Sequence, residues 1–278
     1  MTASLPLHDA TYPHLVDAWL SAVEPFATLA ESLTDEQWTA PSVLPGWTNA
    51  DVVAHVVGIE RDLLGDPTPN PELDWDQLPH AQDLFSRYTE LAVAVRRGEP
   101  QAEVCAELRK TIAARREALA KEPGALGDIV RGPGGWELPR GVVIRMRCFD
   151  IWVHDQDVRA GIGRPGDLDT DAAWVAADQM LRGLGRTWAR DVKAPPGSTA
   201  TVTVTGPGVE FEVAVTIDSS GRGTTVPVPA EPDVHLTMSW PTFAALSTGR
   251  AFAAGEAPVH TGDAPLAERF IANFNVAP

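Results

Sequence analysis

The chain has 278 residues, with 38 acidic and 22 basic side chains and a formal net charge of −16. Its length suits two domains or one large one, and 44% hydrophobic residues supply a packed core, which excludes global disorder. The acidic balance argues against a general nucleic-acid binder and against a polybasic membrane-surface protein, because both depend on Lys and Arg facing phosphates.

Helical spacing of apolar residues dominates the chain up to about residue 195. It predicts six helices, over residues 8–33, 48–64, 80–97, 103–121, 141–160 and 170–190. The second of these begins at Thr48, where the sequence Thr-Asn-Ala-Asp is typical of a capping box. Prolines and glycines predict loops over 41–47 and 66–79 and an irregular connection over 123–139.

The pattern changes after Ala-Pro-Pro-Gly-Ser at 194–198, where apolar and polar residues begin to alternate. Residues 199–205 and 209–217 predict a hairpin across Gly-Pro-Gly, further strands are expected over 224–228 and 233–239, and helices over 241–246 and 264–274. We therefore expect a helical bundle over residues 1–194 and a small α+β domain over 199–278.

Several signals concern the compartment of the protein. Two cysteines cannot form a disulfide framework, and the first nine residues have neither a basic region nor an apolar core of a signal peptide. No apolar run approaches membrane-spanning length. A cytoplasmic protein is therefore expected. Separately, the scarcity of lysine beside abundant Ala, Gly and Pro is typical of a GC-rich genome.

The predicted helix over 141–160 carries ionisable residues on an otherwise apolar stripe. At about 100° per residue, Asp150, His154 and Asp157 share one face with Val143 and Val153. Buried polar groups are costly unless a partner satisfies them, and a metal ion would satisfy a carboxylate and an imidazole together. An Asp and a His four residues apart are also typical of a simple hydrogen-bonded pair.

The predicted helix over 48–64 offers a third ligand. His55 lies in the apolar run 52–57 and shares a face with Val52, Ile59 and Asp62. If the two helices face each other, His55, Asp150 and His154 would form a two-histidine, one-carboxylate site with an open position, the pattern of catalytic metals. A core histidine with an ordinary hydrogen-bond partner is the alternative, and periodicity does not determine which helices pair.

Three segments carry a resemblance to a known family. The sequence LPGWT at 44–48, followed by DVVAH at 51–55, resembles the first motif of the mycothiol-dependent maleylpyruvate isomerase family, within the DinB-like metal-binding bundles. The segment FDIWVHDQDVR at 149–159 resembles its second motif. The segments at 261–266 and 269–270 resemble its appended C-terminal domain, which is similar to sterol-carrier folds.

The resemblance implies a DinB-like four-helix bundle followed by a small α+β, sterol-carrier-like domain. It also implies a divalent metal, typically zinc with nickel, iron or cobalt as alternatives, held by a His of the first motif and a Glu and a His of the second. On this chain the corresponding residues are His55, Asp150 and His154. Asp150 departs from the pattern because it is one methylene shorter than the Glu of the isomerase, so the metal would lie closer to that helix.

The family's chemistry implies mycothiol, a small thiol of actinobacteria, as cosubstrate. A Lewis-acidic metal converts a thiol to the thiolate that attacks an electrophilic carbon, in an isomerase or in an S-transferase. A metal-dependent hydrolase and a non-catalytic metal-binding protein are the alternatives. The expected partners are a small-molecule substrate and a low-molecular-weight thiol, with no nucleic acid and no membrane; the oligomeric state does not follow from the sequence.

Two further residues are candidates for the catalytic site. Asp157, one turn beyond His154, is expected to orient that histidine or handle a proton, with a salt bridge to Arg159 or Arg61 as the alternative. Arg250 is expected to bind an anionic substrate group, because arginine pairs with carboxylates in a bidentate manner, with a solvated side chain as the alternative. A G-x-G-x-x-G pattern at 161–166 follows a helix and contains Pro165, which indicates a helix end and not a nucleotide loop.

Overall fold

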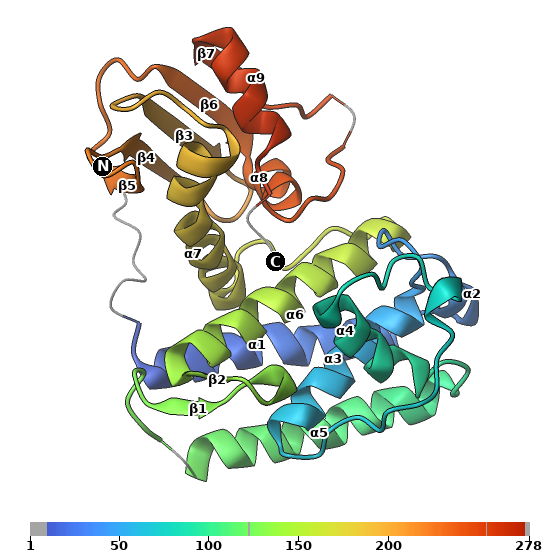
Figure 1. Cartoon of the computed structure of the whole chain (residues 1–278). Coiled ribbons are helices and arrows are strands. Elements are labelled where there is room, and N and C mark those ends of the chain that lie inside the picture. The colour runs from blue at the N-terminus through green and yellow to red at the C-terminus, as the bar shows by residue number, and fades with distance from the viewer. Residues whose placement is uncertain (1–9, 122, 254, 276–278) are drawn as a thin grey trace. The chain divides into compact units, whose positions relative to one another are not determined.

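The computed structural model describes residues 10–121, 123–253 and 255–275. It divides into two compact units, one over Thr11–Gly166 and one that takes up the chain from Asp167 onward (Figure 1). The first unit is helical and the second combines helices with a sheet, which confirms the predicted fold class.

Four long helices build the first unit (Figure 1). They are α1 (Tyr12–Glu31), α3 (Asn49–Leu63), α5 (Gln101–Lys121) and α6 (Arg140–Ile162). Helix α1 packs against α5 and α6, and α3 packs against the same two helices. The short helices α2 (Asp35–Thr39) and α4 (Leu84–Ala94) both contact α3.

The apolar stripe predicted in the first helix forms the core of this unit. Six of its seven members are buried in α1, namely Leu15, Ala18, Trp19, Ala22, Phe26 and Leu29, and the seventh, Leu33, is buried just beyond the end of the helix. Removing side chains of this size from water is the main favourable term in folding. His8 and Asp9, which the predicted helix included, lie outside the described residues.

The helix ends follow local chemistry. Thr48 caps α3 by accepting from the Asp51 amide while the Asp51 carboxylate accepts from the Thr48 amide, the predicted capping box. Helix α6 ends before Gly163, whose φ of 65° is the left-handed conformation common after helices, as the pattern at 161–166 predicted. No helix in the described part of the chain has the length and apolar character that a membrane span requires.

The connection between α5 and α6 is more ordered than predicted. Strands β1 (Ile129–Arg131) and β2 (Glu137–Pro139) pair antiparallel across the 3-10 turn η2 (Pro133–Gly135). The buried carboxylate of Asp62 at the end of α3 accepts from the Arg131 guanidinium at 2.6 Å and from the Gly134 amide at 2.7 Å. These bonds to α3 explain why so short a hairpin is stable, because its own ladder has only three residue pairs.

The second unit begins with α7 (Asp171–Arg186), continued by the π-turn η3 (Thr187–Asp191). Its sheet has the order β5-β4-β3-β6-β7. The strands are β3 (Thr199–Thr205), β4 (Phe211–Ile217), β5 (Gly223–Val226), β6 (Val234–Ser239) and β7 (Val259–Gly262), with helices α8 (Trp240–Ser247) and α9 (Ala264–Ala272). The predicted hairpin at 199–217 is present as β3 and β4, whereas β7 was not predicted.

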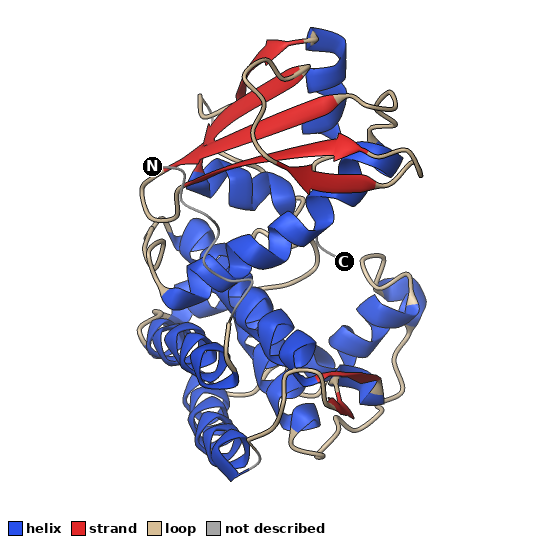
Figure 2. Cartoon of the chain, turned by 90° about the vertical axis from the view of Figure 1, so that its left-hand side faces the viewer, coloured by secondary structure: helices blue, strands red, loops and turns tan. Residues whose placement is uncertain are grey.

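The three central strands, β4, β3 and β6, bury one face of this sheet (Figure 2, strands in red). Paired residues of neighbouring strands point to the same side, so Val202 lies beside Val213 on β4 and Leu236 on β6, and all three are buried. Helices α7, α8 and α9 each contact these strands. The alternation seen in the sequence thus corresponds to one helix-covered face.

The boundary between the units lies earlier than the sequence predicted. Residues 167–194 were assigned to the helical bundle, but α7 packs against β4 and β5 and belongs to the second unit. The contact is close: a Cβ on Gly185 would lie 2.6 Å from the Gly223 carbonyl oxygen. Helical periodicity identified α7 correctly but does not show which surface its apolar face covers.

Candidate metal centre

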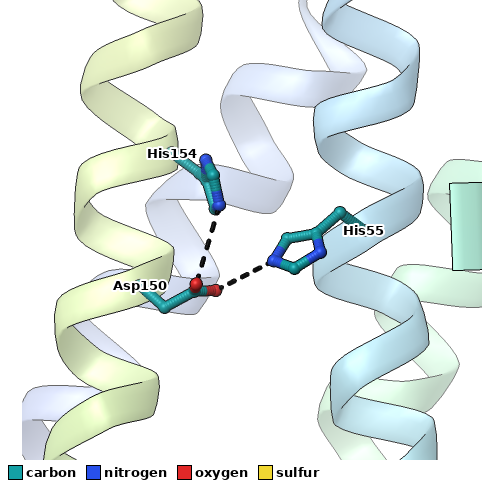
Figure 3. Close-up of side chains that lie close together, drawn as sticks. All are labelled: His55, Asp150 and His154. Atoms are coloured by element: carbon teal, nitrogen blue, oxygen red, sulfur yellow. Dashed lines mark hydrogen bonds and ion pairs between the residues drawn. The ribbon is translucent and has the colours of Figure 1, made fainter. Parts of the chain in front are cut away.

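Helix α3 presents the first candidate ligand. The capping box at Thr48 fixes the start of the helix, and His55 follows two turns later in the run of buried residues Val52–Val57. The His55 side chain is 4% exposed, and its Nε2 atom points toward α6 (Figure 3). His55 is therefore an inward-facing histidine, as the sequence predicted.

Helix α6 presents the other two candidate ligands. Asp150 and His154 lie four residues apart and so share one face, from which both side chains point toward His55 (Figure 3). His154 is 9% exposed at the side chain, whereas Asp150 is 28% exposed. Solvent therefore reaches this centre at the carboxylate, while both imidazoles are buried.

The three side chains converge closely enough to share a cation. His55 Nε2 lies 3.3 Å from Asp150 Oδ2, and His154 Nε2 lies 3.6 Å from Asp150 Oδ1. One potential ligand atom from each residue lies within 4.8 Å of the others. Two atoms bound tetrahedrally to one zinc at 2.0–2.1 Å are about 3.4 Å apart, so the two contacts to Asp150 already have this spacing, whereas separations approaching 4.8 Å would have to shorten on binding.

The charge states also suit ligation. Burial, the largest influence, lowers the pKa of His55, which favours the neutral imidazole that binds metals. Burial alone would raise the pKa of Asp150, but Arg147, His55 and His154 together hold it well below its usual range. Asp150 is therefore ionised at neutral pH and supplies the negative charge that a divalent cation requires.

A second carboxylate lies behind His154. Asp157 is buried, and its Oδ2 lies 2.9 Å from His154 Nδ1. This contact fixes the ring so that Nε2 faces the centre, an arrangement common for metal-bound histidines. Arg159 pairs with Asp155, and Arg61 pairs with Glu107.

A buried ion network also holds Asp150. Arg147 donates to Asp150 Oδ2 at 2.8 Å and to Glu60 Oε1 at 2.7 Å. Glu60 is fully buried and also accepts from Arg115 on α5 at 3.0 Å. The network joins α3, α5 and α6 and anchors one oxygen of Asp150. Sequence periodicity does not predict this network, because its members lie on three helices and periodicity does not show how those helices pair.

Trp47 lies against both imidazoles. Its ring centroid is 5.3 Å from that of His55 and 6.3 Å from that of His154. The residue precedes α3 and stands in the motif LPGWT. The indole therefore forms one wall of the candidate centre.

Arg250 lies in the other unit, three residues after the end of α8. It is half-buried, and its guanidinium donates to the Thr248 carbonyl at 2.6 Å. The other predicted site residues lie together in the first unit: His55, Asp150, His154 and Asp157. The candidate centre is therefore built within that unit.

These features define a class: a helical bundle with two imidazoles and a carboxylate converging between two of its helices, joined to a separate α+β unit. A family model described as the mycothiol maleylpyruvate isomerase N-terminal domain matches residues 19–159, about half of the chain. The chain belongs to this family, as its two N-terminal motifs predicted. The prediction of an enzyme family is thereby confirmed.

Two solved structures have a similar fold. One is described as the mycothiol-dependent maleylpyruvate isomerase, with 16% sequence identity, a TM-score of 0.55, and coverage of 91% of this chain and 94% of that one. The other is a histidine-to-alanine variant of the mycothiol-dependent maleylpyruvate isomerase, with the same identity and coverage and a TM-score of 0.57. At this identity the likeness shows the fold. No curated protein sequence matches the chain.

Proposed function

We propose that this protein is a cytoplasmic, metal-dependent enzyme that uses mycothiol to isomerise a small electrophilic substrate or to transfer the thiol to it. The observation that carries the proposal is the convergence of His55, Asp150 and His154 within 4.8 Å, in a chain that belongs to the maleylpyruvate isomerase family. The partial exposure of Asp150 supports access for a small molecule.

The residues suit a divalent cation of the zinc type, since two imidazoles and one carboxylate leave a position open. Nickel, iron and cobalt accept the same donors. When bound, the cation would supply the positive charge at which a thiol loses its proton at neutral pH. Asp157 keeps the His154 ring oriented, and Arg147 holds one oxygen of Asp150, so the donors are arranged before any ligand arrives.

The substrate chemistry follows from the nucleophile. A thiolate forms a carbon–sulfur bond with one carbon of a conjugated double bond, whose electron pair moves into the neighbouring carbonyl. Rotation about the resulting single bond and departure of the thiolate complete an isomerisation, whereas protonation of the adduct completes a transfer. We assign Arg250 to the binding of a substrate carboxylate, so Arg250→Ala should raise KM and leave the metal content unchanged.

Metal content tests the ligand assignment. His154→Ala should reduce the metal measured by elemental analysis from one equivalent to a small fraction, because only two donors remain. His235→Ala is the matched control, since His235 contacts Thr203 on the sheet of the other unit and should retain a full equivalent. A full equivalent of metal in His154→Ala would overturn the assignment.

A cobalt-substituted protein tests the thiol. Mycothiol should produce a sulfur-to-cobalt charge-transfer band, and that band should be absent in His154→Ala. Turnover of electrophilic substrates should require mycothiol. Two results together would instead show a hydrolase in which water is the nucleophile. These are turnover of an ester or amide library without mycothiol, and no charge-transfer band when mycothiol is added.

A further inference from the structure

A buried carboxylate lies behind the Trp47 wall of the candidate centre. Glu90, on α4, has no exposed surface, and its Oε2 accepts from the Trp47 indole nitrogen at 2.7 Å. His80 Nε2 lies 3.0 Å from the same oxygen, and Arg97 pairs with Oε1 at 3.0 Å. Three groups from separate segments therefore converge on one carboxylate, which contacts none of the candidate ligands.

The loop that carries Trp47 is closely fitted to this cluster. A Cβ on Gly46 would lie 2.2 Å from His80 Nδ1, and Gly46 has a φ of 82°, which other residues adopt only with strain. Arg97 also pairs with Asp51, the carboxylate of the α3 capping box. Loop, α3 and α4 thus meet around Glu90, and the indole is held by its one polar atom.

Stability alone is a weak explanation for such a group. A buried charge with good partners often contributes no more than well-packed apolar side chains would, and such groups are best explained by the arrangement that they impose. Here the arrangement is the tilt of the indole, 38° to the His55 ring and 43° to the His154 ring. The mechanism derived above does not use Glu90, yet Glu90 bonds directly to the group that covers both imidazoles.

We propose that Glu90 is a positioning residue: it holds Trp47 against His55 and His154, so that the indole fixes the two rings and closes that side of the centre to water. A ligand then approaches from the exposed side of Asp150. The inference rests on the proposed function, because it treats the two imidazoles as ligands. It predicts that Glu90 affects the metal centre only through Trp47.

The cobalt-substituted protein provides the test, since its visible absorption and circular dichroism report ligand geometry. Glu90→Leu removes the acceptor and Trp47→Phe removes the indole N–H, and each should bind one equivalent of cobalt with an altered spectrum and an affinity lowered about tenfold, the lower end for groups that orient ligands. Glu90→Gln keeps an acceptor for the indole and should retain the wild-type spectrum. In the double variant of Glu90→Leu with Trp47→Phe, the spectrum should match that of Trp47→Phe alone.

Glu107→Gln is the matched control. Glu107 pairs with Arg96 and Arg61 in the same unit, so its loss should lower stability and leave the cobalt spectrum unchanged. A wild-type spectrum in Glu90→Leu, or a further change when Glu90→Leu is added to Trp47→Phe, would overturn the inference. If Glu90→Leu does not fold, Glu90→Met, which removes the acceptor and keeps nearly the same shape, takes its place in the same comparison. Absence of cobalt binding by the wild-type protein would overturn the proposed function as well. Failure of the proposed function is thus distinguished from failure of the inference about Glu90 alone, in which the wild-type protein still binds cobalt.

Discussion

At the residue scale, His154 uses its two ring nitrogens for different purposes. Nδ1 lies against the buried carboxylate of Asp157, and Nε2 faces Asp150 across the candidate centre. A carboxylate at Nδ1 fixes the ring orientation and the tautomer in which Nε2 is free to bind a metal. Asp157 therefore orients His154 for metal binding, although Asp157 is not itself a candidate ligand.

Asp157→Asn should weaken metal binding without abolishing it. The amide keeps the shape and can accept from Nδ1, but it lacks the negative charge, so we expect the dissociation constant for zinc or cobalt to rise about tenfold. Competition against a chromophoric chelator measures this change. Asp155→Asn, two positions earlier on α6 and paired with Arg159, is the control. An unchanged affinity in Asp157→Asn would show that the contact does not support ligation.

The sequence predicted these residues unequally. Asp150, His154 and Asp157 follow from the helical period, because one helix fixes their spacing. His55 could be paired with them only through the family motifs, since convergence of two helices is a tertiary property. Glu90 had no signal at all: it lies 43 residues from Trp47 and contacts it only because α4 packs on α3.

At the scale of elements, the buried network of Glu60 sets how α3, α5 and α6 pack. Burial alone would raise the pKa of Glu60, but Arg147 and Arg115 hold it below its ordinary value. Such a carboxylate adds stability that is fully present above its unfolded pKa near 4.3 and is lost as the pH falls through the folded pKa. The helix pairing that builds the centre is therefore sensitive to acid.

The urea midpoint of the apoprotein should be steady from about pH 7 to 5.5 and fall below about pH 4.3, as Glu60 takes up a proton. Glu60→Gln should cost about 3–5 kcal/mol at pH 7, because it leaves two arginines without their shared buried partner. The variant should also show a shallower fall with acid. If the two proteins lose stability in parallel below pH 4.3, Glu60 is not a source of the pH dependence.

The elements that the sequence missed share a physical cause. Strands β1 and β2 have three residues each, too few for an alternating pattern, and their stability comes from Asp62 on a distant helix. Strand β7 has only four residues and pairs at an edge with β6. Long helices and the β3–β4 hairpin were predicted because their periodicity is local, whereas these strands depend on tertiary contacts.

At the scale of the whole molecule, the two units have separate cores. The residues of the candidate centre and of the Glu60 and Glu90 networks all lie within Thr11–Gly166. Helix α7 buries Val175 and Ala176 in the unit that contains the sheet. The metal centre should therefore need only the first unit, while Arg250 belongs to the second.

A fragment of residues 11–166 should fold and bind one equivalent of zinc, with the cobalt spectrum of the full chain, because every candidate ligand and its support lie inside it. A fragment of residues 11–194, cut at the boundary that the sequence predicted, should aggregate more readily, since it exposes the apolar face of α7 without the sheet that covers it. Circular dichroism, metal analysis and light scattering compare the two. The division is wrong if the longer fragment is the more soluble and only it retains metal, because α7 would then be part of the bundle.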